Sequence, residues 1–372
     1  MSEPIRILQV FAQMNRGGAE TMIMNLYRHI DRSKIQFDFI VHTKEKCAFD
    51  DEITQLGGRI FRVPKYNGLN HFAYKRAWKK ILVCNPNYKI IHGHVRSTAA
   101  IYLNLAKKTK AITICHSHAT SSRGKIVERL VKKLMQFPLR FISDYFFACS
   151  NEAAIWLFGK NILNNNNYYL FKNAINLDLF NYNDKARKAT RERLGLNEEL
   201  LIGHVGSFTK EKNHEFLIDV YFEISKRLSS ARLLLIGDGT LIDTIKTKIN
   251  ELKINDKVKI IQNCDRVYDY YMAMDLFVFP SLHEGLGIAL IEAQAAGLQC
   301  YASQNRVPIE AKVTENVEFL PIELTAEKWA DYIITNLNRE ITRKSSLLEF
   351  KDKGYDIKDT SNWLEKFYLG FN

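Results

Sequence analysis

Apolar runs of strand length alternate with stretches of helical pattern along the chain, and this alternation occurs twice. The runs of the first half are 5–11, 37–42, 57–64, 88–94, 111–118 and 144–150. Those of the second half are 201–208, 231–239, 258–262, 275–281, 298–303 and 317–322. Strands that alternate with helices predict parallel sheets that are covered on both faces. The polar and charged stretch between the two series predicts a linker near 178–190.

The length of 372 residues is typical of two domains. We therefore expect two Rossmann-like, doubly wound α/β domains, 1–180 and 190–354, that face each other across a cleft. A closing helix within 355–372 is expected to pack back on the first domain. Ligands of such sheets bind outside the carboxyl ends of the strands.

The net positive charge of the chain comes entirely from its first half. Residues 1–180 contain 27 of the 53 Lys and Arg residues but only 12 of the 41 acidic residues. A basic half attracts phosphorylated substrates, nucleic acid or an anionic membrane face. Nucleic acid is not expected as a partner, because no aromatic stacking motif accompanies the basic residues.

Six cysteines occur without a CxxC pair, and we expect buried, reduced thiols in a cytoplasmic protein. No signal peptide or membrane-spanning run is recognisable in the sequence. Four histidines are close in sequence, at positions 92, 94, 116 and 118, and leave zinc as a minor alternative.

The segment 280–297, PSLHEGLGIALIEAQAAG, joins a strand to a helix through a glycine-rich turn. Glu284 and Glu292 have seven residues between them, and Gly285 and Gly287 let the backbone approach a ligand closely. The N-terminus of the helix offers N–H groups and a positive dipole end to a phosphate. We expect both carboxylates on nearly the same helix face, where they can accept hydrogen bonds from sugar hydroxyls.

Further motifs follow one another in a fixed order. They are GGAET (17–21), ICHSH (114–118), FFACS (146–150), KNAINLDLF (172–180), VGSFTKEKNH (205–214), LLLIGDG (233–239) and AMDLFVFPS (273–281). Together with the Glu-x7-Glu spacing, this series resembles the retaining GT-B glycosyltransferases of family four, the class used in polysaccharide assembly. The resemblance covers most of the chain and implies a metal-independent transfer of a sugar from a nucleotide-diphosphate donor, without a cofactor.

The resemblance also implies roles for individual residues. Glu292 corresponds to the residue that binds the donor ribose, and Glu284 to the one that contacts the transferred sugar. Lys212 corresponds to the cation that neutralises the leaving diphosphate, a group whose charge grows in the transition state. His116 corresponds to a histidine near the reacting centre, and His118 is the less favoured choice. The remaining implied donor contacts are Gly17, Gly18, Gly206, Ser207, Gly285, Leu286, Gly287 and Ile288.

Two departures from the family pattern are visible. Ser207 stands where the family usually has Arg after Gly206, so one cation is missing. The segment 262–271, QNCDRVYDYY, does not identify the nucleotide base, although a UDP-sugar is our expectation. The alternatives are a UDP-sugar 2-epimerase and a non-catalytic sugar-nucleotide-binding subunit. An NAD dehydrogenase is disfavoured, because the first loop lacks GxGxxG.

The stretch 124–141 predicts an amphipathic helix with one basic face. Its basic residues are Lys125, Arg129, Lys132, Lys133 and Arg140. Such a helix either packs on the core with a solvated face or rests on an anionic membrane. Since glycan or lipid-linked acceptors are implied by the resemblance, we expect a peripheral location on the inner face of the cell membrane.

Overall fold

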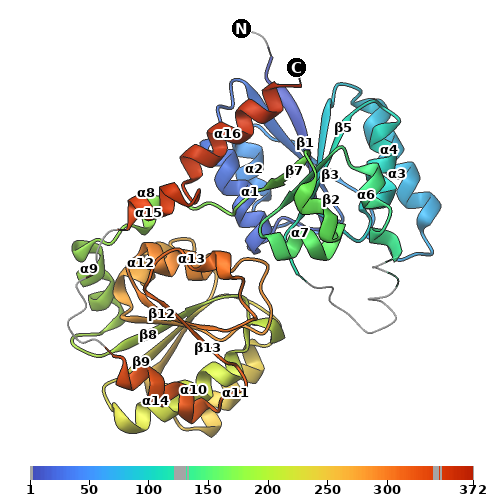
Figure 1. Cartoon of the computed structure of the whole chain (residues 1–372). Helices are drawn as coiled ribbons and strands as arrows, with labels where there is room; N and C mark the ends of the chain where they lie inside the picture. The colour runs from blue at the N-terminus through green and yellow to red at the C-terminus, as the bar shows by residue number, and fades with distance from the viewer. Residues whose placement is uncertain (1–2, 121–130, 132–133, 338–342, 344–345, 372) are drawn as a thin grey trace. The chain divides into compact units, whose positions relative to one another are not determined.

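The computed structural model of the chain forms two compact units (Figure 1). It describes residues 3–120, 131, 134–337, 343 and 346–371. The first unit comprises Met1–Ile175 and Gly354–Asn372, and the second comprises Asn176–Lys353. Each unit contains one parallel sheet flanked by helices, which confirms the predicted pair of Rossmann-like α/β domains.

The first unit has a seven-stranded sheet in the order β3-β2-β1-β4-β5-β6-β7. Its strands are β1 (Ile5–Phe11), β2 (Ile35–Val41), β3 (Ile60–Arg62), β4 (Ile90–Gly93), β5 (Ile112–Ser117), β6 (Tyr145–Ala148) and β7 (Tyr168–Leu170). All neighbouring strands are parallel, as the near-continuous apolar runs of the sequence indicate.

Helices cover this sheet and bury large aromatic side chains against it. They are α1 (Gly18–His29), α2 (Asp50–Gln55), α3 (His71–Cys84), α4 (Ala99–Lys107), α6 (Leu139–Ile142), α7 (Asn151–Phe158) and α16 (Ile357–Leu369). Trp78 of α3 and Tyr102 of α4 are fully buried and stack with ring centroids 4.9 Å apart. The closing helix α16 packs against α1, so the first unit is completed by the last residues of the chain.

The second unit has a six-stranded sheet in the order β10-β9-β8-β11-β12-β13. Its strands are β8 (Leu201–Val205), β9 (Arg232–Ile236), β10 (Val258–Ile261), β11 (Leu276–Phe279), β12 (Gln299–Ser303) and β13 (Val317–Leu320). Its helices are α8 (Leu177–Phe180), α9 (Asp184–Leu194), α10 (His214–Arg227), α11 (Ile242–Glu251), α12 (Val267–Ala273), α13 (Ile288–Ala295), α14 (Ala326–Thr335) and α15 (Leu347–Asp352). Trp329 and Tyr221 are buried in one hydrophobic cluster between α10, α14 and the sheet.

Both sheets reverse their strand order beside their first strand. In the first unit β1 lies between β2 and β4, and in the second β8 lies between β9 and β11. Loops that leave two such strands run in opposite directions, which opens a crevice at the carboxyl ends of the strands. Each unit therefore has one position that is preformed for a ligand.

The charged run 183–193, which we expected to be part of a linker, forms helix α9 of the second unit instead. Arginines of this helix reach the backbone at the end of α12. Arg187 Nη2 lies 2.6 Å from Asp275 Oδ1, and Arg191 Nη1 lies 3.2 Å from Asp275 Oδ2. Asp275 also accepts the backbone N–H of Leu201 at 2.7 Å. The arginines of this segment thus belong to a largely buried ion-pair network. The sequence pattern alone does not tell such arginines from arginines that are exposed to solvent.

No disulfide joins any of the six cysteines, all of which lie in the described part of the chain, but they are not all buried. Cys47, Cys115, Cys149 and Cys300 are buried as expected. The expectation was wrong for Cys84, which is exposed at the end of α3, and for Cys264, which is partly exposed. Both lie at the edges of elements, where an apolar run does not guarantee burial.

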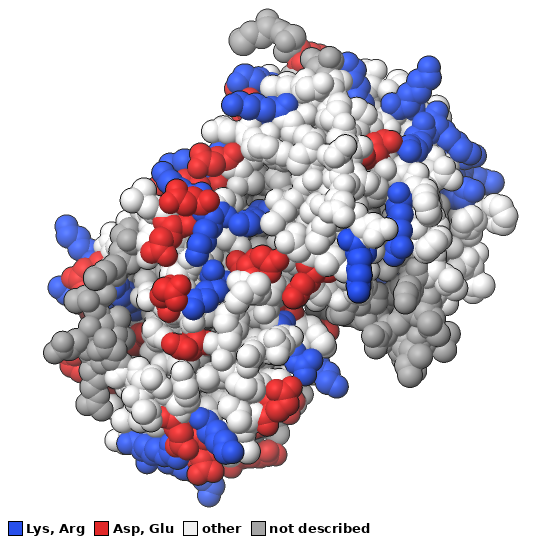
Figure 2. Space-filling view, in the orientation of Figure 1, with Lys and Arg blue, Asp and Glu red and all other residues white. Residues whose placement is uncertain are grey.

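The basic excess of the first half is concentrated on two helices. Residues 71–84 and 99–110, which include α3 and α4, contain seven Lys and Arg residues and no Asp or Glu. In Figure 2 blue side chains gather over the part of the first unit where Figure 1 shows these helices. Over the described ranges, no helix is both long enough and apolar enough to span a membrane.

We expect Asp275→Asn to lower the free energy of unfolding by about 3 kcal/mol, because two arginines then lose their buried partner. Chemical denaturation measures the difference. Asp184→Asn is the matched control, since Asp184 pairs with Lys188 of the same helix at an exposed position. That variant should change stability by less than about 0.5 kcal/mol. Equal effects of the two substitutions would contradict a structural role for the Asp275 network.

Candidate functional site

Lys212 and Glu284 meet where the strand order of the second unit reverses. Lys212 follows β8, Glu284 follows β11, and Lys212 Nζ lies 2.6 Å from Glu284 Oε1. Two hydrogen bonds join the loops that carry them: Leu282 N–H to the Glu211 carbonyl at 2.7 Å, and Asn213 Nδ2 to the Pro280 carbonyl at 3.2 Å. The side chains of Lys212 and Glu284 are mostly buried, so this ion pair is weakly screened by water.

Gly206 provides the room for the lysine. A Cβ atom at this position would lie 3.2 Å from Lys212 Cδ and 3.0 Å from His204 Nε2. Ser207, which follows it, is exposed in the loop after β8. The implied phosphate loop therefore has one lysine held inward and a small polar residue in place of the usual arginine.

Helix α13 begins at Ile288, and the glycine-rich turn precedes it. Gly287 adopts a left-handed conformation (φ 90°), which favours glycine, and Leu286 is buried. Glu284 and Gly285 lie in the loop before the helix, so the prediction of two glutamates on nearly the same helix face was wrong. The helix starts four positions later than the spacing argument assumed, and only Glu292 belongs to it.

Glu292 is buried on α13 beside an aromatic hydroxyl. Tyr271 Oη donates to Glu292 Oε2 at 2.9 Å. Burial raises the pKa of Glu292 to about 7, although the Tyr271 hydrogen bond and the charge of Lys212 act in the opposite direction. A carboxylate in this state can accept hydrogen bonds from a diol and gains strength from the low dielectric around it.

Gly17 and Gly18 lie in the first unit, at the beginning of α1. A Cβ atom on Gly17 would lie 2.3 Å from Glu20 Oε2, at the end of a flexible side chain that would have to move. The N–H groups of such a first turn lack acceptors within the helix. Because Gly17 and Gly18 follow β1, they lie where the strand order of the first sheet reverses.

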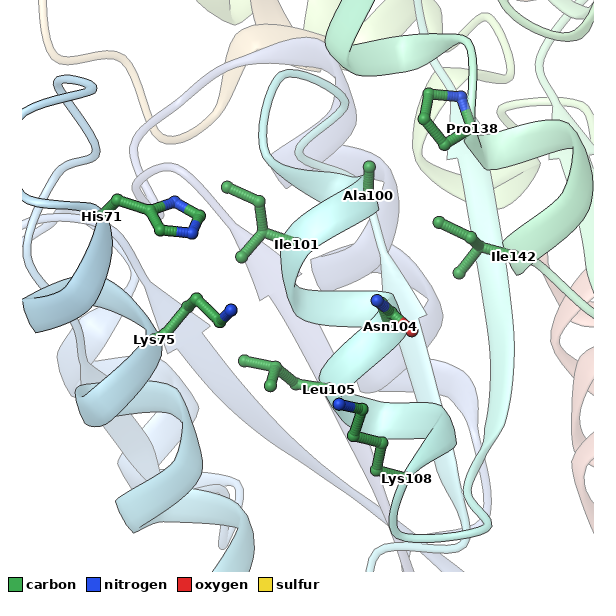
Figure 3. A pocket seen from close by; sticks show the side chains of 9 residues that line it. All are labelled: His71, Lys75, Ala100, Ile101, Asn104, Leu105, Lys108, Pro138 and Ile142. Carbon is green, nitrogen blue, oxygen red and sulfur yellow. The ribbon is translucent and has the colours of Figure 1, made fainter.

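A surface pocket of about 290 Å³ lies between α3, α4 and the segment around α6. Figure 3 shows Ile101 and Leu105 of α4 pointing toward His71 and Lys75 of α3. Its other lining residues are Ala100, Asn104, Lys108, Pro138 and Ile142. The pocket combines an apolar floor with lysines at its margin and is separate from the predicted donor residues.

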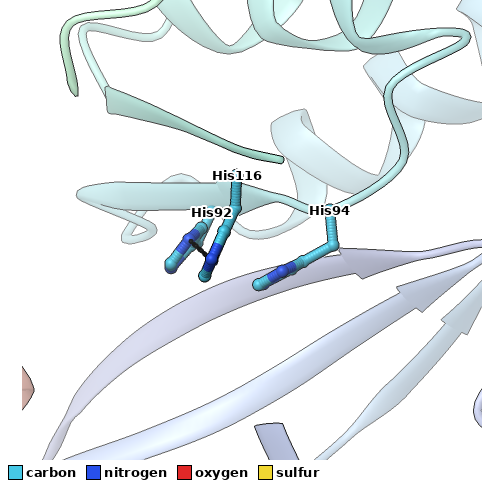
Figure 4. A group of neighbouring side chains, drawn as sticks. All are labelled: His92, His94 and His116. Carbon is cyan, nitrogen blue, oxygen red and sulfur yellow. Dashed lines mark hydrogen bonds between the residues drawn. The ribbon is translucent and has the colours of Figure 1, made fainter. Parts of the chain in front are cut away.

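Four histidines gather in the first unit, two from the end of each of two neighbouring strands. His116 lies on β5 and is fully buried, as is nearly all of His92 on β4. His94 and His118 follow two positions later on the same faces, since alternate residues of a strand share a face. Figure 4 shows three of the rings side by side.

These histidines form two hydrogen-bonded pairs that stack on each other. His92 Nε2 and His116 Nδ1 are 3.2 Å apart, and His94 Nδ1 and His118 Nε2 are 2.7 Å apart. The ring centroids within these pairs are 5.3 and 5.0 Å apart, and the ring planes are inclined by 15° and 22°. Between the pairs the centroids are 3.9 Å apart for His116 and His118, which is a stacked contact.

The nitrogen atoms of His92, His94 and His116 lie within 4.8 Å of one another, close enough to hold a metal ion. Five of their six ring nitrogens already take part in hydrogen bonds, however. A metal would have to displace these bonds. The arrangement therefore favours a hydrogen-bonded cluster over a metal centre.

The hydrogen-bond partners of Glu292 and of the histidines were not predicted from the sequence. Tyr271 is the hydroxyl donor to Glu292, while Gln9 and Tyr368 hydrogen-bond to His94 and His92. The patterns His-x-His at 92–94 and 116–118 on adjacent strands could have indicated a shared face. No comparable signal exists for Tyr368, which is 276 positions from His92 in the sequence.

Comparison with known families divides the chain as the structure does. Residues 16–179 match the model of Glycosyltransferase Family 4, and residues 186–347 match that of Glycosyl transferases group 1. Residues 16–175 of the first match lie in the first unit and its last four residues in the second unit, which also contains the whole of the second match.

Relatives and solved structures agree with these matches. The chain is 34% identical over 317 residues to putative glycosyltransferase EpsF of Bacillus subtilis, covering 84% of this chain and 81% of EpsF. It is 25% identical to the capsular polysaccharide biosynthesis glycosyltransferase CapH of Staphylococcus aureus, covering 98% and 99% of the two chains. Anabaena HepE in complex with UDP-glucose has a similar fold, with a TM-score of 0.79 at 16% identity and coverage of 98% and 99%.

We expect Glu292→Gln to be more stable than the wild type at pH 8 but equally stable at pH 5. The folded state holds the Glu292 proton up to about pH 7, whereas the unfolded chain releases it near its ordinary value of 4.5. Stability of the wild type therefore falls as pH rises between these values, by on the order of 3 kcal/mol. Denaturation midpoints at the two pH values measure it. A wild type that gains stability over this interval relative to the variant would contradict the assignment.

Proposed function

We propose that this chain, which belongs to glycosyltransferase family 4, is a retaining enzyme that moves a sugar from a UDP-sugar to a glycan or lipid-linked acceptor. The names of EpsF and CapH support polysaccharide synthesis as its setting, and HepE, with UDP-glucose bound, supports the donor. The observation that carries the proposal is the meeting of Lys212 and Glu284 at the strand-order reversal, with Glu292 on the adjoining helix.

Each of these groups has one task in the proposed reaction. Glu292 accepts hydrogen bonds from the donor ribose, and the turn that contains Gly287 brings backbone N–H groups to the diphosphate. Lys212 exchanges its pairing with Glu284 for the leaving phosphate, and Glu284 is then available to a hydroxyl of the transferred sugar. Binding thus converts a protein ion pair into two contacts with the donor.

Retention is what the resemblance to the family implies. A covalent intermediate is not proposed, because both site carboxylates are assigned to binding the donor, Glu284 to a hydroxyl of the sugar and Glu292 to the ribose. Glu284 is paired with Lys212, and Glu292 is hydrogen-bonded by Tyr271. In the proposed step the bond between the sugar C1 and the phosphate oxygen breaks as the acceptor oxygen bonds C1 on the same face. The leaving phosphate oxygen takes the proton of the acceptor hydroxyl. Lys212 stabilises the charge of the diphosphate, so we propose no metal for this reaction.

The proposal is tested by incubating the protein with UDP-, GDP- and ADP-sugars in the presence of EDTA and following the products by NMR. We expect release of UDP only, and a product with the anomeric configuration of the donor. An inverted anomer would refute retention, and loss of activity in EDTA would refute metal independence. A donor sugar altered at C2 would identify an epimerase instead.

We expect Lys212→Ala to lower kcat by about 100-fold or more while changing donor affinity much less. Its charge contributes most when the diphosphate leaves, and removal of one such group costs roughly 10²–10³ in kcat. Lys210→Ala is the matched control, because Lys210 is exposed in the same loop. Steady-state turnover and calorimetric binding separate the two effects. Wild-type turnover in Lys212→Ala would remove this lysine from the reaction.

We propose in addition that the first unit binds an anionic membrane surface. Most of the predicted basic helix, including Lys125, Arg129, Lys132 and Lys133, lies outside the described residues. The part that is described exposes large apolar side chains: Leu134 is 75% exposed, Phe137 56% and Phe141 74%. Leu134 and Phe137 precede α6, and Phe141 belongs to it. Helix α6 contacts α4 and lines the surface pocket (Figure 3).

The charge around this apolar patch fits anionic lipid. Helix α3 adds exposed Phe72 together with Arg76, Lys79 and Lys80, and α4 ends in further lysines. Apolar side chains that enter the headgroup region and lysines that face anionic lipid reinforce each other. Such a surface would keep the enzyme beside a lipid-linked acceptor.

We expect the protein to float with vesicles that contain anionic lipid at low salt, and Lys79→Glu, Lys80→Glu and Lys108→Glu together to abolish flotation. Each lysine contributes about 1 kcal/mol near such a surface. The control is the same reversal at Lys246, Lys253 and Lys259, three exposed lysines of the second unit. If both triple variants lost flotation equally, net charge alone would explain the binding. If the α3–α4 variant still floated, another surface would bind the vesicles.

A further inference from the structure

A continuous hydrogen-bonded chain links all four clustered histidines through two other side chains. His118 contacts His94 at 2.7 Å, and His94 Nε2 contacts Gln9 Oε1 at 3.0 Å. Gln9 Nε2 donates to Tyr368 Oη at 3.2 Å, which lies 2.7 Å from His92 Nδ1. The last link joins His92 to His116. The six side chains come from β1, β4, β5, the residues that follow β4 and β5, and α16, all within the first unit.

Both ends of this chain have an unused ring nitrogen. In the described part of the molecule, His116 Nε2 and His118 Nδ1 are buried without a hydrogen-bond partner. The rings of these two residues stack, so the two atoms belong to neighbouring side chains. Buried polar atoms are normally satisfied, so these two nitrogens are available to a ligand with matching groups.

The amide of Gln9 determines which atoms in the chain hold protons. Its oxygen can only accept, so His94 must donate from Nε2 and accept at Nδ1, and His118 must therefore donate from Nε2. Its nitrogen donates to Tyr368, whose single proton then goes to His92 Nδ1. His92 must donate from Nε2 to His116 Nδ1, which leaves the proton of His116 on Nε2.

The histidines remain neutral, as these assignments require. Burial holds the pKa values of His92, His94 and His116 well below the usual value. It lowers the pKa of His118 to about 3. A neutral imidazole has one donor and one acceptor nitrogen, so every link in the chain has a single direction. Links of one direction polarise one another and strengthen the groups at both ends.

We propose that Gln9 and Tyr368 are positioning residues that fix the four histidines in the Nε2–H tautomer. His116 then presents a hydrogen-bond donor and His118 an acceptor, and together they bind one hydroxyl group of a carbohydrate substrate. A hydroxyl group both accepts and donates, which matches this pair. The carbohydrate rests on the proposed function, whereas the tautomers do not.

The arrangement also defines the chemistry of His116. Its Nδ1 lone pair is occupied by His92, and its Nε2 already carries a proton. His116 therefore acts on a substrate oxygen as a donor and does not serve as a general base. The accepting nitrogen belongs to His118, which is partly exposed.

The tautomers are tested by long-range ¹⁵N–¹H NMR of the full chain labelled in its 10 histidines. We expect four neutral imidazoles near pH 7 with protonated Nε2 and bare Nδ1, assigned by single His→Gln substitutions. A proton on Nδ1 of His116 or His118 would overturn the proposal.

Two conservative substitutions cut the chain on opposite sides of Gln9. Tyr368→Phe should release His92 and His116 to a mixture of tautomers while His94 and His118 remain fixed. His94→Phe should free His118 alone. A variant that lost only packing would leave the tautomers unchanged, and that result for Tyr368→Phe would refute the positioning role.

The kinetic consequence is measured on Tyr368→Phe with the best nucleotide-sugar donor. We expect kcat to fall about tenfold, the typical value of one hydrogen bond. Wild-type kcat together with altered His116 tautomers would overturn the role of the pair at the hydroxyl group. Because the NMR measurement needs no substrate, a chain that transfers no sugar would refute the proposed function and leave the tautomer assignment intact.

Discussion

The reversal of strand order beside β1 and β8 determines where every candidate functional group lies. In a parallel sheet all carboxyl ends meet at one edge, and the loops of two adjacent strands diverge only where the order reverses. Gly17 follows β1 and His94 follows β4, while Lys212 follows β8 and Glu284 follows β11. Within each unit, residues that are far apart in the sequence thus come to the same edge of the sheet without any long loop.

Burial then determines what these groups can do. The same low dielectric that strengthens the ion pair of Lys212 and Glu284 raises the pKa of Glu292 and keeps His116 neutral. One physical effect therefore yields a strong charge pair, a carboxylate that titrates near neutrality and an uncharged imidazole. The difference between them lies in the partners: a lysine, a tyrosine hydroxyl and a second histidine.

Most of the fold and part of the site could be predicted from the sequence. Runs such as 5–11 and 275–281 gave strands because burial on both faces requires continuous apolar side chains. Motif spacing singled out Lys212, Glu284 and Glu292 as candidates, and the structure pairs the first two at 2.6 Å. The helical state of 184–194 was missed, because its stability depends on Asp275, a contact of long sequence separation. Tyr271 and Tyr368 were missed for the same reason: a tyrosine in an amphipathic helix has the same local pattern whether its hydroxyl meets water or a buried polar side chain.

The position of α16 has a consequence for how the molecule is made. The first unit needs Gly354–Asn372, and Tyr368 occupies a fully buried place beside Gln9 and His92. During synthesis on the ribosome, residues 1–175 emerge long before this helix exists, so the polar interior of the first unit stays open while the whole second unit is being translated. N-terminal domains generally fold first as the chain emerges. In this chain the first unit begins to fold first but is completed last. A nascent chain that stalls after residue 353 would contain the sheet of the first unit but lack Tyr368, so its histidine cluster would be incomplete.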